Sequence, residues 1–189
     1  TFTISFPGTA FDEGRYAAAV AQHLGTDHLD SYVLHGPSRR EGLGEADVAA
    51  WRAMEALQRA GAVRELGVSN VSPSQLQAFV ELAAVKPRWV QNRCYASTGW
   101  DAATRRICAE HGIAYQGFSL LTANRGVWSH PQVRAVAEER DCTPAQVLFG
   151  LALALGITPL TGTSDAAHML ADLAVEPLDD ATAKRLEAL

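Results

Sequence analysis

Residues 46–73, ADVAAWRAMEALQRAGAVRELGVSNVSP, contain the pattern that decides the fold class. Apolar side chains recur about every 3.6 residues through 46–60, which predicts an amphipathic helix that Gly61 ends. A short apolar run at 63–68 then predicts a buried strand. The Ser-Pro pair that follows is typical of an N-cap and the first position of a new helix. The stretch therefore predicts a strand between two helices.

The same alternation extends in both directions along the chain. Strands joined by helices run parallel, because each crossover returns the chain to the same edge of the sheet. The predicted fold class is α/β, a (β/α)₈ TIM-barrel type in incomplete form, with about six parallel strands in a single domain, 1–189. The further strands are expected at 1–6, 29–35, 89–94, 113–118 and 157–160. The further helices are expected at 14–24, 73–82, 101–111, 131–140, 145–155, before Leu173 and at 179–189, with a long loop at 121–129.

An open doubly wound sheet also fits this alternation. No GxGxxG follows the first strand and no GxxxxGK[ST] occurs anywhere in the chain. Because these glycine-rich loops hold phosphates in open nucleotide-binding sheets, their absence favours the barrel.

Composition excludes several classes of protein. The chain has 189 residues, with 16 basic and 21 acidic side chains and a net charge of −5, which argues against binding to nucleic acid or to anionic membranes. No apolar run approaches the roughly 18 residues of a membrane span, and the first residues lack the basic region of a signal peptide. The three cysteines form no C-x-x-C pair, and the histidines form no H-x-H or H-E-x-x-H pair, so no metal site is predicted. The unpaired cysteines also favour a reducing, cytoplasmic location.

Polar residues follow the predicted strands at the ends where a barrel carries its active face. They occur in LHGP, LGVSN, VQNR, GFSLL and PLTGTSD. Together with the segments LGTDHLDSYVLHGP, WRAMEALQRAGAVRELGVSN, AEHGIAYQGFSLL and CTPAQVLFGLALALGITPLTGTSDAAHML, they resemble the aldo-keto reductase family. The resemblance runs from that family's third strand to its C-terminal helix.

The resemblance implies roles for five residues around the nicotinamide. His35 would donate a hydrogen bond to the carbonyl oxygen of the substrate. Ser69, Asn70 and Gln91 would hold the nicotinamide carboxamide, whose donors and acceptor such side chains can satisfy. Phe118 would stack on the nicotinamide ring, where many members carry Tyr. Plainer interpretations are a turn and N-cap for the Ser-Asn pair and core packing for the phenylalanine.

The remaining residues would bind the rest of the cofactor. The backbone around Ser119 and Leu121 would wrap the pyrophosphate. A helix N-terminus after Thr161, Gly162 and Thr163 would face the adenosine 2′-phosphate. Two residues would lie near the adenine, His168 and Asp172. The family's usual lysine and serine of this segment are Leu160 and Thr161 here, so NADP is the expected cofactor and NAD stays an alternative.

The resemblance also implies an activity, NAD(P)H-dependent reduction of the carbonyl group of small aldehydes or ketones. Its catalytic Asp and Tyr precede the third strand and would lie upstream of Thr1. At the position of the catalytic lysine this chain has Ser5, and its two lysines, Lys86 and Lys184, fall elsewhere. The tyrosines are expected on helices or in mid-strand, so none is predicted to replace the catalytic one. Activity of this chain alone is therefore expected to be impaired.

The chain is also about 60 residues shorter than a barrel of about 250. It could be part of a longer reductase, a shortened relative, or a homodimer whose strand edges pair between subunits. Two other functions stay open: a non-catalytic nucleotide-binding relative, and a different barrel enzyme such as a metal-dependent hydrolase or a lyase. Trp100 and Trp128 are candidate walls of the substrate pocket or caps on the barrel rim.

Overall fold

The computed structural model describes residues 2–5, 25 and 28–189, and the helix expected at 14–24 lies outside them. The chain divides into two compact units, each described by itself below. The N-terminal unit comprises 1–91 and 107–114, and the C-terminal unit comprises 92–106 and 115–189. Strands follow one another in the sheet in their sequence order, from β1 to β6. Neighbouring strands pair in parallel in each of the units, which confirms the predicted parallel α/β class.

Most element boundaries lie within one or two residues of those that periodicity predicts. The strands are β1 (Phe2–Ser5), β2 (Leu29–Leu34), β3 (Val63–Ser69), β4 (Trp89–Arg93), β5 (Ala114–Phe118) and β6 (Ile157–Leu160). The helices are α2 (Glu45–Arg59), α3 (Pro73–Leu82), α4 (Ala102–Glu110), α5 (Arg125–Trp128), α6 (Pro131–Glu139), α7 (Pro144–Ala154), α8 (Ala166–Leu173) and α9 (Asp180–Glu187), with a 3₁₀ turn at Ala96–Thr98. The short helix α5 corrects the prediction of an unbroken loop at 121–129.

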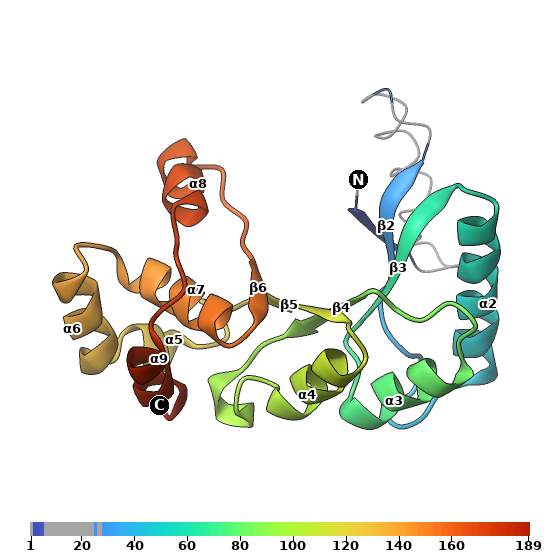
Figure 1. The fold of residues 1–189 in the computed structure, drawn as a ribbon, viewed down its shortest axis with the longest axis horizontal. Coiled ribbons are helices and arrows are strands. Elements are labelled where there is room, and N and C mark those ends of the chain that lie inside the picture. Colours follow the sequence, from blue (N-terminus) through green and yellow to red (C-terminus); the bar gives the residue numbers. More distant parts are fainter. Residues whose placement is uncertain (1, 6–24, 26–27) are drawn as a thin grey trace. The chain divides into compact units, whose positions relative to one another are not determined.

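The core of the N-terminal unit forms where α2 packs along β2 and β3, with α3 beside α2 (Figure 1). Trp51 of α2 and Phe79 of α3 are fully buried, with ring centroids 5.2 Å apart. Such a tilted aromatic pair contributes about 0.5–1.5 kcal/mol beyond its buried area. The register of the parallel pair β3 and β4 aligns Ser69 with Gln91, so these two expected site residues lie next to each other on adjacent strands.

A buried carboxylate joins α2 to the segment that leads into β4. Glu55 is 1% exposed, and its Oε1 accepts hydrogen bonds from the N–H groups of Ala84 (2.8 Å) and Val85 (3.1 Å). Arg52 donates to the other oxygen at 3.0 Å. Burial opposes ionisation of Glu55, yet the N–H of Val85 and the Arg52 guanidinium outweigh it and hold its pKa below the usual value. The carboxylate therefore holds the segment before β4 in place.

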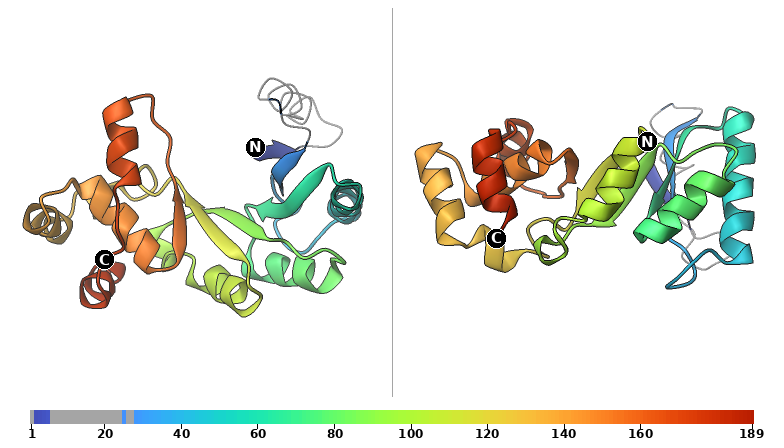
Figure 2. Two further views of the ribbon diagram at one scale, coloured as in Figure 1. Left: turned by 45° about the horizontal axis from the view of Figure 1, so that its top comes forward. Right: turned by 60° about the horizontal axis from the view of Figure 1, so that its bottom comes forward.

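In the C-terminal unit, α7 packs against β6, α6 and α9 (Figure 2). Two glycines permit close packing within this unit. A Cβ at Gly150 of α7 would lie 2.9 Å from the carbonyl of Glu176, and one at Gly117 of β5 would lie 2.8 Å from the Ile157 side chain. Larger residues at these positions would force the neighbouring segments apart.

The segment before α4 corrects an expectation about Trp100. Its ring is fully buried, and its indole N–H donates to the carbonyl of Glu187 at 3.2 Å, so Trp100 is neither a pocket wall nor a rim cap. The left-handed backbone at Trp100 and Asp101, with φ near 57° and 56°, turns the ring into the core of its unit. Trp128 of α5 is 39% exposed.

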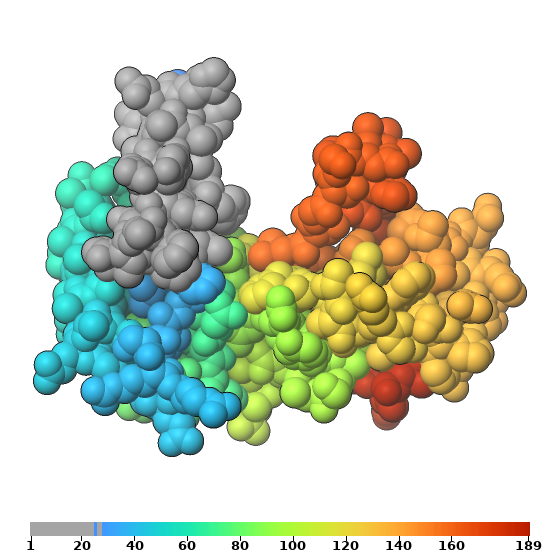
Figure 3. Space-filling model, turned by 180° about the vertical axis from the view of Figure 1, so that it is seen from behind, coloured from blue at the N-terminus to red at the C-terminus, as the bar shows by residue number. Residues whose placement is uncertain are grey.

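Helix α8 stands clear of the rest of the C-terminal unit in the space-filling view (Figure 3). Its apolar side chains are correspondingly uncovered, with Leu170 69% and Leu173 84% exposed. None of the helices in the described ranges is long and apolar enough to cross a membrane.

Candidate functional site

The residues expected around the nicotinamide fall into two groups, one in each unit. In the N-terminal unit, hydrogen bonds connect the carboxyl ends of β2, β3 and β4. The hydroxyl of Ser69 donates to the carbonyl of Gln91 at 2.6 Å, and the N–H of Asn70 donates to that carbonyl at 3.1 Å. The Asn70 amide also donates to the carbonyl of His35 at 2.8 Å and to the Ser69 hydroxyl at 3.1 Å. The structure therefore brings together His35, Ser69, Asn70 and Gln91.

Asn70 adopts a left-handed backbone conformation, with φ of 52°. Asparagine tolerates this region better than most residues, because its short amide can bond locally. The turn ends β3 and allows Ser72 to cap α3, where its hydroxyl accepts from the N–H of Gln75. The predicted N-cap is thus confirmed, and the turn leaves the Asn70 side chain exposed at the strand end.

His35 lies just beyond β2, and its side chain is exposed. Two buried side chains that sequence analysis missed hold the loop that follows it. Asp47 accepts from the N–H of Ser38 (2.8 Å) and from the N–H of Gly44 (2.6 Å). The Gln75 amide donates to the carbonyls of residues 39 and 42. Their position at the first turn of a helix was a usable signal, because acidic and amide residues there often bond backbone N–H groups.

In the C-terminal unit, Phe118 ends β5 level with Leu160 of β6. Ser119 then turns left-handed, with φ of 58°, and its carbonyl accepts from the N–H of Ala123 at 2.8 Å. Within the described residues, neither the N–H of Ser119 nor that of Leu121 donates a hydrogen bond. These two groups can therefore donate to an anionic ligand such as a pyrophosphate.

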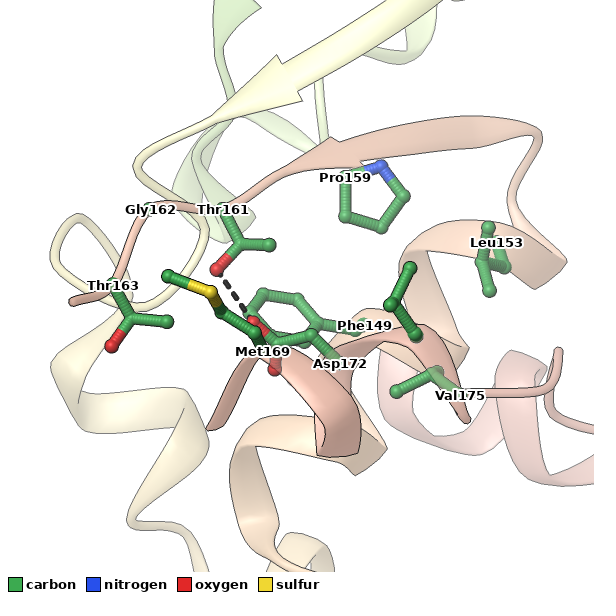
Figure 4. Close-up of a pocket in the computed structure, with 10 residues that line it drawn as sticks. Phe149, Leu153, Pro159, Thr161, Gly162, Thr163, Met169, Asp172 and Val175 are labelled. Atoms are coloured by element: carbon green, nitrogen blue, oxygen red, sulfur yellow. Dashed lines mark hydrogen bonds between the residues drawn. The ribbon is translucent and has the colours of Figure 1, made fainter. Parts of the chain in front are cut away.

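A hollow of about 440 Å³ opens between β6, α7 and α8 (Figure 4). Its walls are mainly apolar, and four expected site residues line it: Thr161, Gly162, Thr163 and Asp172. The Thr161 hydroxyl donates to Asp172 at 2.8 Å, the contact marked in Figure 4. Asp172 is the one charged residue in this lining, so the hollow carries a negative charge.

The structure does not bring His168 to this hollow. Its side chain is 71% exposed and faces Asp165 at 4.0 Å. Asp165 caps α8 by accepting from the N–H groups of Ala167 (2.8 Å) and His168 (3.3 Å). The N–H of Ala167 is the larger cause that holds the pKa of Asp165 below its usual value. The helix N-terminus expected to face a phosphate thus already binds its own carboxylate.

Among the described residues, neither lysine makes a hydrogen bond to an expected site residue. The Lys86 ammonium donates to the carbonyls of Val80 and Ala83 at the end of α3, and Lys184 lies on α9. Cys94 is buried beside β5, and burial raises the pKa of its thiol to about 11, so the thiol stays protonated. Among the described residues, no group of three or more His, Cys, Asp or Glu is placed to hold a metal ion.

A protein-family model matches the part of the chain that carries the strand-end residues described above. The model of the Aldo/keto reductase family matches residues 15–126. This chain is an aldo/keto reductase family member. The match covers the strand ends that carry His35, Ser69, Asn70, Gln91 and Phe118, and so confirms the resemblance on which their predicted roles depend.

Two curated members of the aldo/keto reductase family are similar in sequence. The aldo-keto reductase of Mycolicibacterium vanbaalenii is 31% identical over 90% of this chain and 59% of its own length. The NADPH-dependent alpha-keto amide reductase of Saccharomyces cerevisiae is 29% identical over 87% of this chain and 58% of its own length. The chain therefore spans less than two thirds of the length of these relatives.

A solved structure shows the same fold. A mutant of Gox0644 in complex with NADPH matches with a TM-score of 0.82, over 98% of this chain and 68% of that one, at 24% identity. The fold of this aldo/keto reductase family member is thus that of the family's barrel, of which the residues that the structure describes form six strands. The homodimer and the cytoplasmic location stay predictions.

Proposed function

We propose that this protein is an NADP(H)-dependent oxidoreductase that reduces the carbonyl group of small aldehydes or ketones. The observation that carries the proposal is the hydrogen-bonded group at the ends of β2, β3 and β4. There, Ser69 and Asn70 bind the carbonyl of Gln91, and Asn70 binds the carbonyl of His35. The family match and the NADPH-dependent relative support this function.

The chemistry of the residues fits a nicotinamide dinucleotide. A carboxamide needs both donors and an acceptor, and the side chains of Ser69, Asn70 and Gln91 offer both. The unused N–H groups of Ser119 and Leu121 suit a pyrophosphate, and the hollow at Thr161 suits an adenosine. NADPH supplies the hydride when it is bound. The exposed His35 would orient the substrate carbonyl by donating a hydrogen bond to its oxygen.

The Gln91→Ala variant tests the cofactor site. The amide is lost from a buried position, so NADPH should bind more weakly by about 1–3 kcal/mol, or about 5- to 150-fold in Kd. NADPH titration followed by fluorescence measures this change. Gln77→Ala on α3 is the matched control, because that amide contacts Glu81 and should leave Kd unchanged. Equal Kd values for the wild type and Gln91→Ala, with an intact fold, would reject the assigned role.

Cofactor selectivity is expected to be weak. Nearby cations would strengthen binding of the 2′-phosphate of NADPH, but the lining of the hollow has Asp172 and no Lys or Arg. NADPH and NADH should therefore bind with Kd values within about tenfold of each other. Asp172→Asn removes a repulsion of about 1 kcal/mol, so it should tighten NADPH by about fivefold and leave NADH unchanged. Competitive titration of both cofactors checks this, and an NADPH preference above 100-fold in the wild type would contradict it.

The positions of the lysines favour a second candidate function. The Lys86 ammonium is engaged by the carbonyls of Val80 and Ala83 at the end of α3, so it is not available to polarise a proton donor beside His35. A protein that binds the nucleotide without reducing carbonyls would need no such cation. Turnover, described in the Discussion, separates the two candidates.

A further inference from the structure

The last residue of β4 carries a cation that sequence analysis did not assign to any role. The guanidinium carbon of Arg93 lies 5.8 Å from the centroid of the Phe118 ring. Its Nη1 donates to the hydroxyl of Tyr95 at 3.4 Å. The Arg93 side chain is exposed and pairs with no carboxylate in the part of the chain that the structure describes. Arg93, Tyr95 and Phe118, all in the C-terminal unit, form what we call the Arg93 cluster.

The position of Tyr95 corrects an expectation. Each tyrosine was expected on a helix or in mid-strand, but Tyr95 lies beyond the end of β4, at the N-cap of the 3₁₀ turn. It therefore lies at the carboxyl end of the strand, where barrels carry their active face.

Hydrogen bonds to backbone groups fix the main chain of this cluster. The buried Asn124 amide donates to the carbonyls of Cys94 (2.9 Å) and Leu120 (2.8 Å), and its oxygen accepts from the N–H of Ala96 (2.7 Å). The N–H of Cys94 also donates to the carbonyl of Phe118 at 3.1 Å. Tyr95 thus lies between two residues whose backbones are held, so the cluster is organised before any ligand arrives.

Strand geometry sets the direction in which Arg93 faces. Side chains alternate along a strand, so Arg93 lies on the same face of β4 as Gln91, two residues earlier. The residue between them, Asn92, points the other way and donates to Asp101 at 2.8 Å. On β5, Tyr115 also donates to Asp101, and Phe118, three residues later, takes the opposite face. Arg93 therefore lies on the same face as Phe118, the residue of the C-terminal unit that is expected to stack on the nicotinamide.

The chemistry of the cluster suits a carboxylate. A guanidinium offers a planar fork of N–H donors that matches the two oxygens of a carboxylate. The Tyr95 hydroxyl accepts from Arg93, so its own proton is available for a further acceptor. The Phe118 ring adds an apolar surface beside these donors.

We propose that Arg93, assisted by Tyr95, binds the carboxylate of a small organic acid beside Phe118. The site lies within the C-terminal unit, and Arg93 is its charged contact.

Binding of benzoate and benzamide to the 189-residue chain, measured by calorimetry with and without NADP⁺, tests the proposal. The two probes share shape but differ in charge. Benzoate should bind at least tenfold more tightly than benzamide, and Arg93→Gln should weaken benzoate about tenfold while leaving benzamide unchanged. Tyr95→Phe should weaken benzoate about threefold, and Arg93→Lys should fall between the wild type and Arg93→Gln.

Arg134→Gln is the matched control, because it removes the same charge from an exposed position on α6 of the same unit. It should leave benzoate binding unchanged. Equal benzoate affinity in Arg93→Gln and the wild type, equal affinity of the wild type for both probes, or an equal loss in Arg134→Gln would each overturn the proposal. A chain that binds benzoate through Arg93 but does not bind NADP⁺ would contradict the proposed function and leave the carboxylate site supported.

Discussion

The 189-residue chain is expected to reduce 4-nitrobenzaldehyde with NADPH at least about a hundredfold more slowly than the enzyme median of about 10 s⁻¹. The alkoxide that forms on hydride transfer needs a proton, and a phenol with a pKa near 10 donates it well only beside a cation. Ser5 stands at the family's lysine position, the Lys86 ammonium is engaged by the carbonyls of Val80 and Ala83, and the loss of general-acid catalysis lowers rates by about 10²–10⁴. Consumption of NADPH at saturating aldehyde, followed by absorbance, measures this rate.

Turnover near 10 s⁻¹ would contradict this prediction and show that another group supplies the proton. Tyr95 would then be the first residue to examine, because its hydroxyl accepts a hydrogen bond from the Arg93 cation. In that case Tyr95→Phe should abolish most of the rate. Arg134→Gln serves as the control for the general effects of substitution in the C-terminal unit.

Asn124→Ala is expected to destabilise the C-terminal unit by about 3 kcal/mol. The substitution leaves the carbonyls of Cys94 and Leu120 and the N–H of Ala96 without their buried partner. Each unsatisfied buried group has a penalty of about 1–3 kcal/mol, which local rearrangement and water partly offset. Urea unfolding, followed by circular dichroism, should show a lower midpoint for the variant.

Thr122→Ala is the control for this measurement, because Thr122 is exposed in the same loop. Its midpoint should equal that of the wild type. If Asn124→Ala unfolds at the same urea concentration as the wild type, Asn124 does not hold the segments after β4 and β5 together. The organisation of the Arg93 cluster would then need another explanation.

Hydrophobic periodicity was sufficient to predict most of the secondary structure. The stretch from α2 to α3 illustrates why: the apolar stripe of α2, the left-handed Gly61 after it and the Ser72 cap are each local signals. Local signals of this kind survive in the folded chain because no tertiary contact opposes them. The parallel pairing then follows from the helical crossovers alone.

Features that depend on tertiary contacts were predicted less well. The burial of Trp100 depends on its contact with Glu187, which is 87 residues away in the sequence. The helix α5 is four residues long, too short for a hydrophobic period to be read. His168 lies beside Asp165, the carboxylate that caps α8, rather than in the hollow.

In the candidate site, too, residues that are neighbours in sequence were predicted, and residues that depend on distant contacts were missed. The residues of the PLTGTSD segment were expected together because they are neighbours in sequence, and Asp172 joins them through Thr161 in the structure. Arg93, Tyr95 and Asn124 were missed, although Arg93 follows Gln91 by two residues and its shared strand face could have been inferred. The role of Asn124 could not have been inferred, since its partners lie 4 to 30 residues away.

The most direct test of the central claim is the transfer of hydride from the cofactor to a carbonyl carbon. The chain is incubated for hours with 4-nitrobenzaldehyde and NADPH that carries deuterium at both C4 positions of the nicotinamide, and the alcohol is analysed by mass spectrometry. The proposed function predicts 4-nitrobenzyl alcohol with one deuterium, in excess of an enzyme-free control and reduced in His35→Ala. Alcohol without deuterium, or none above the control, would contradict it.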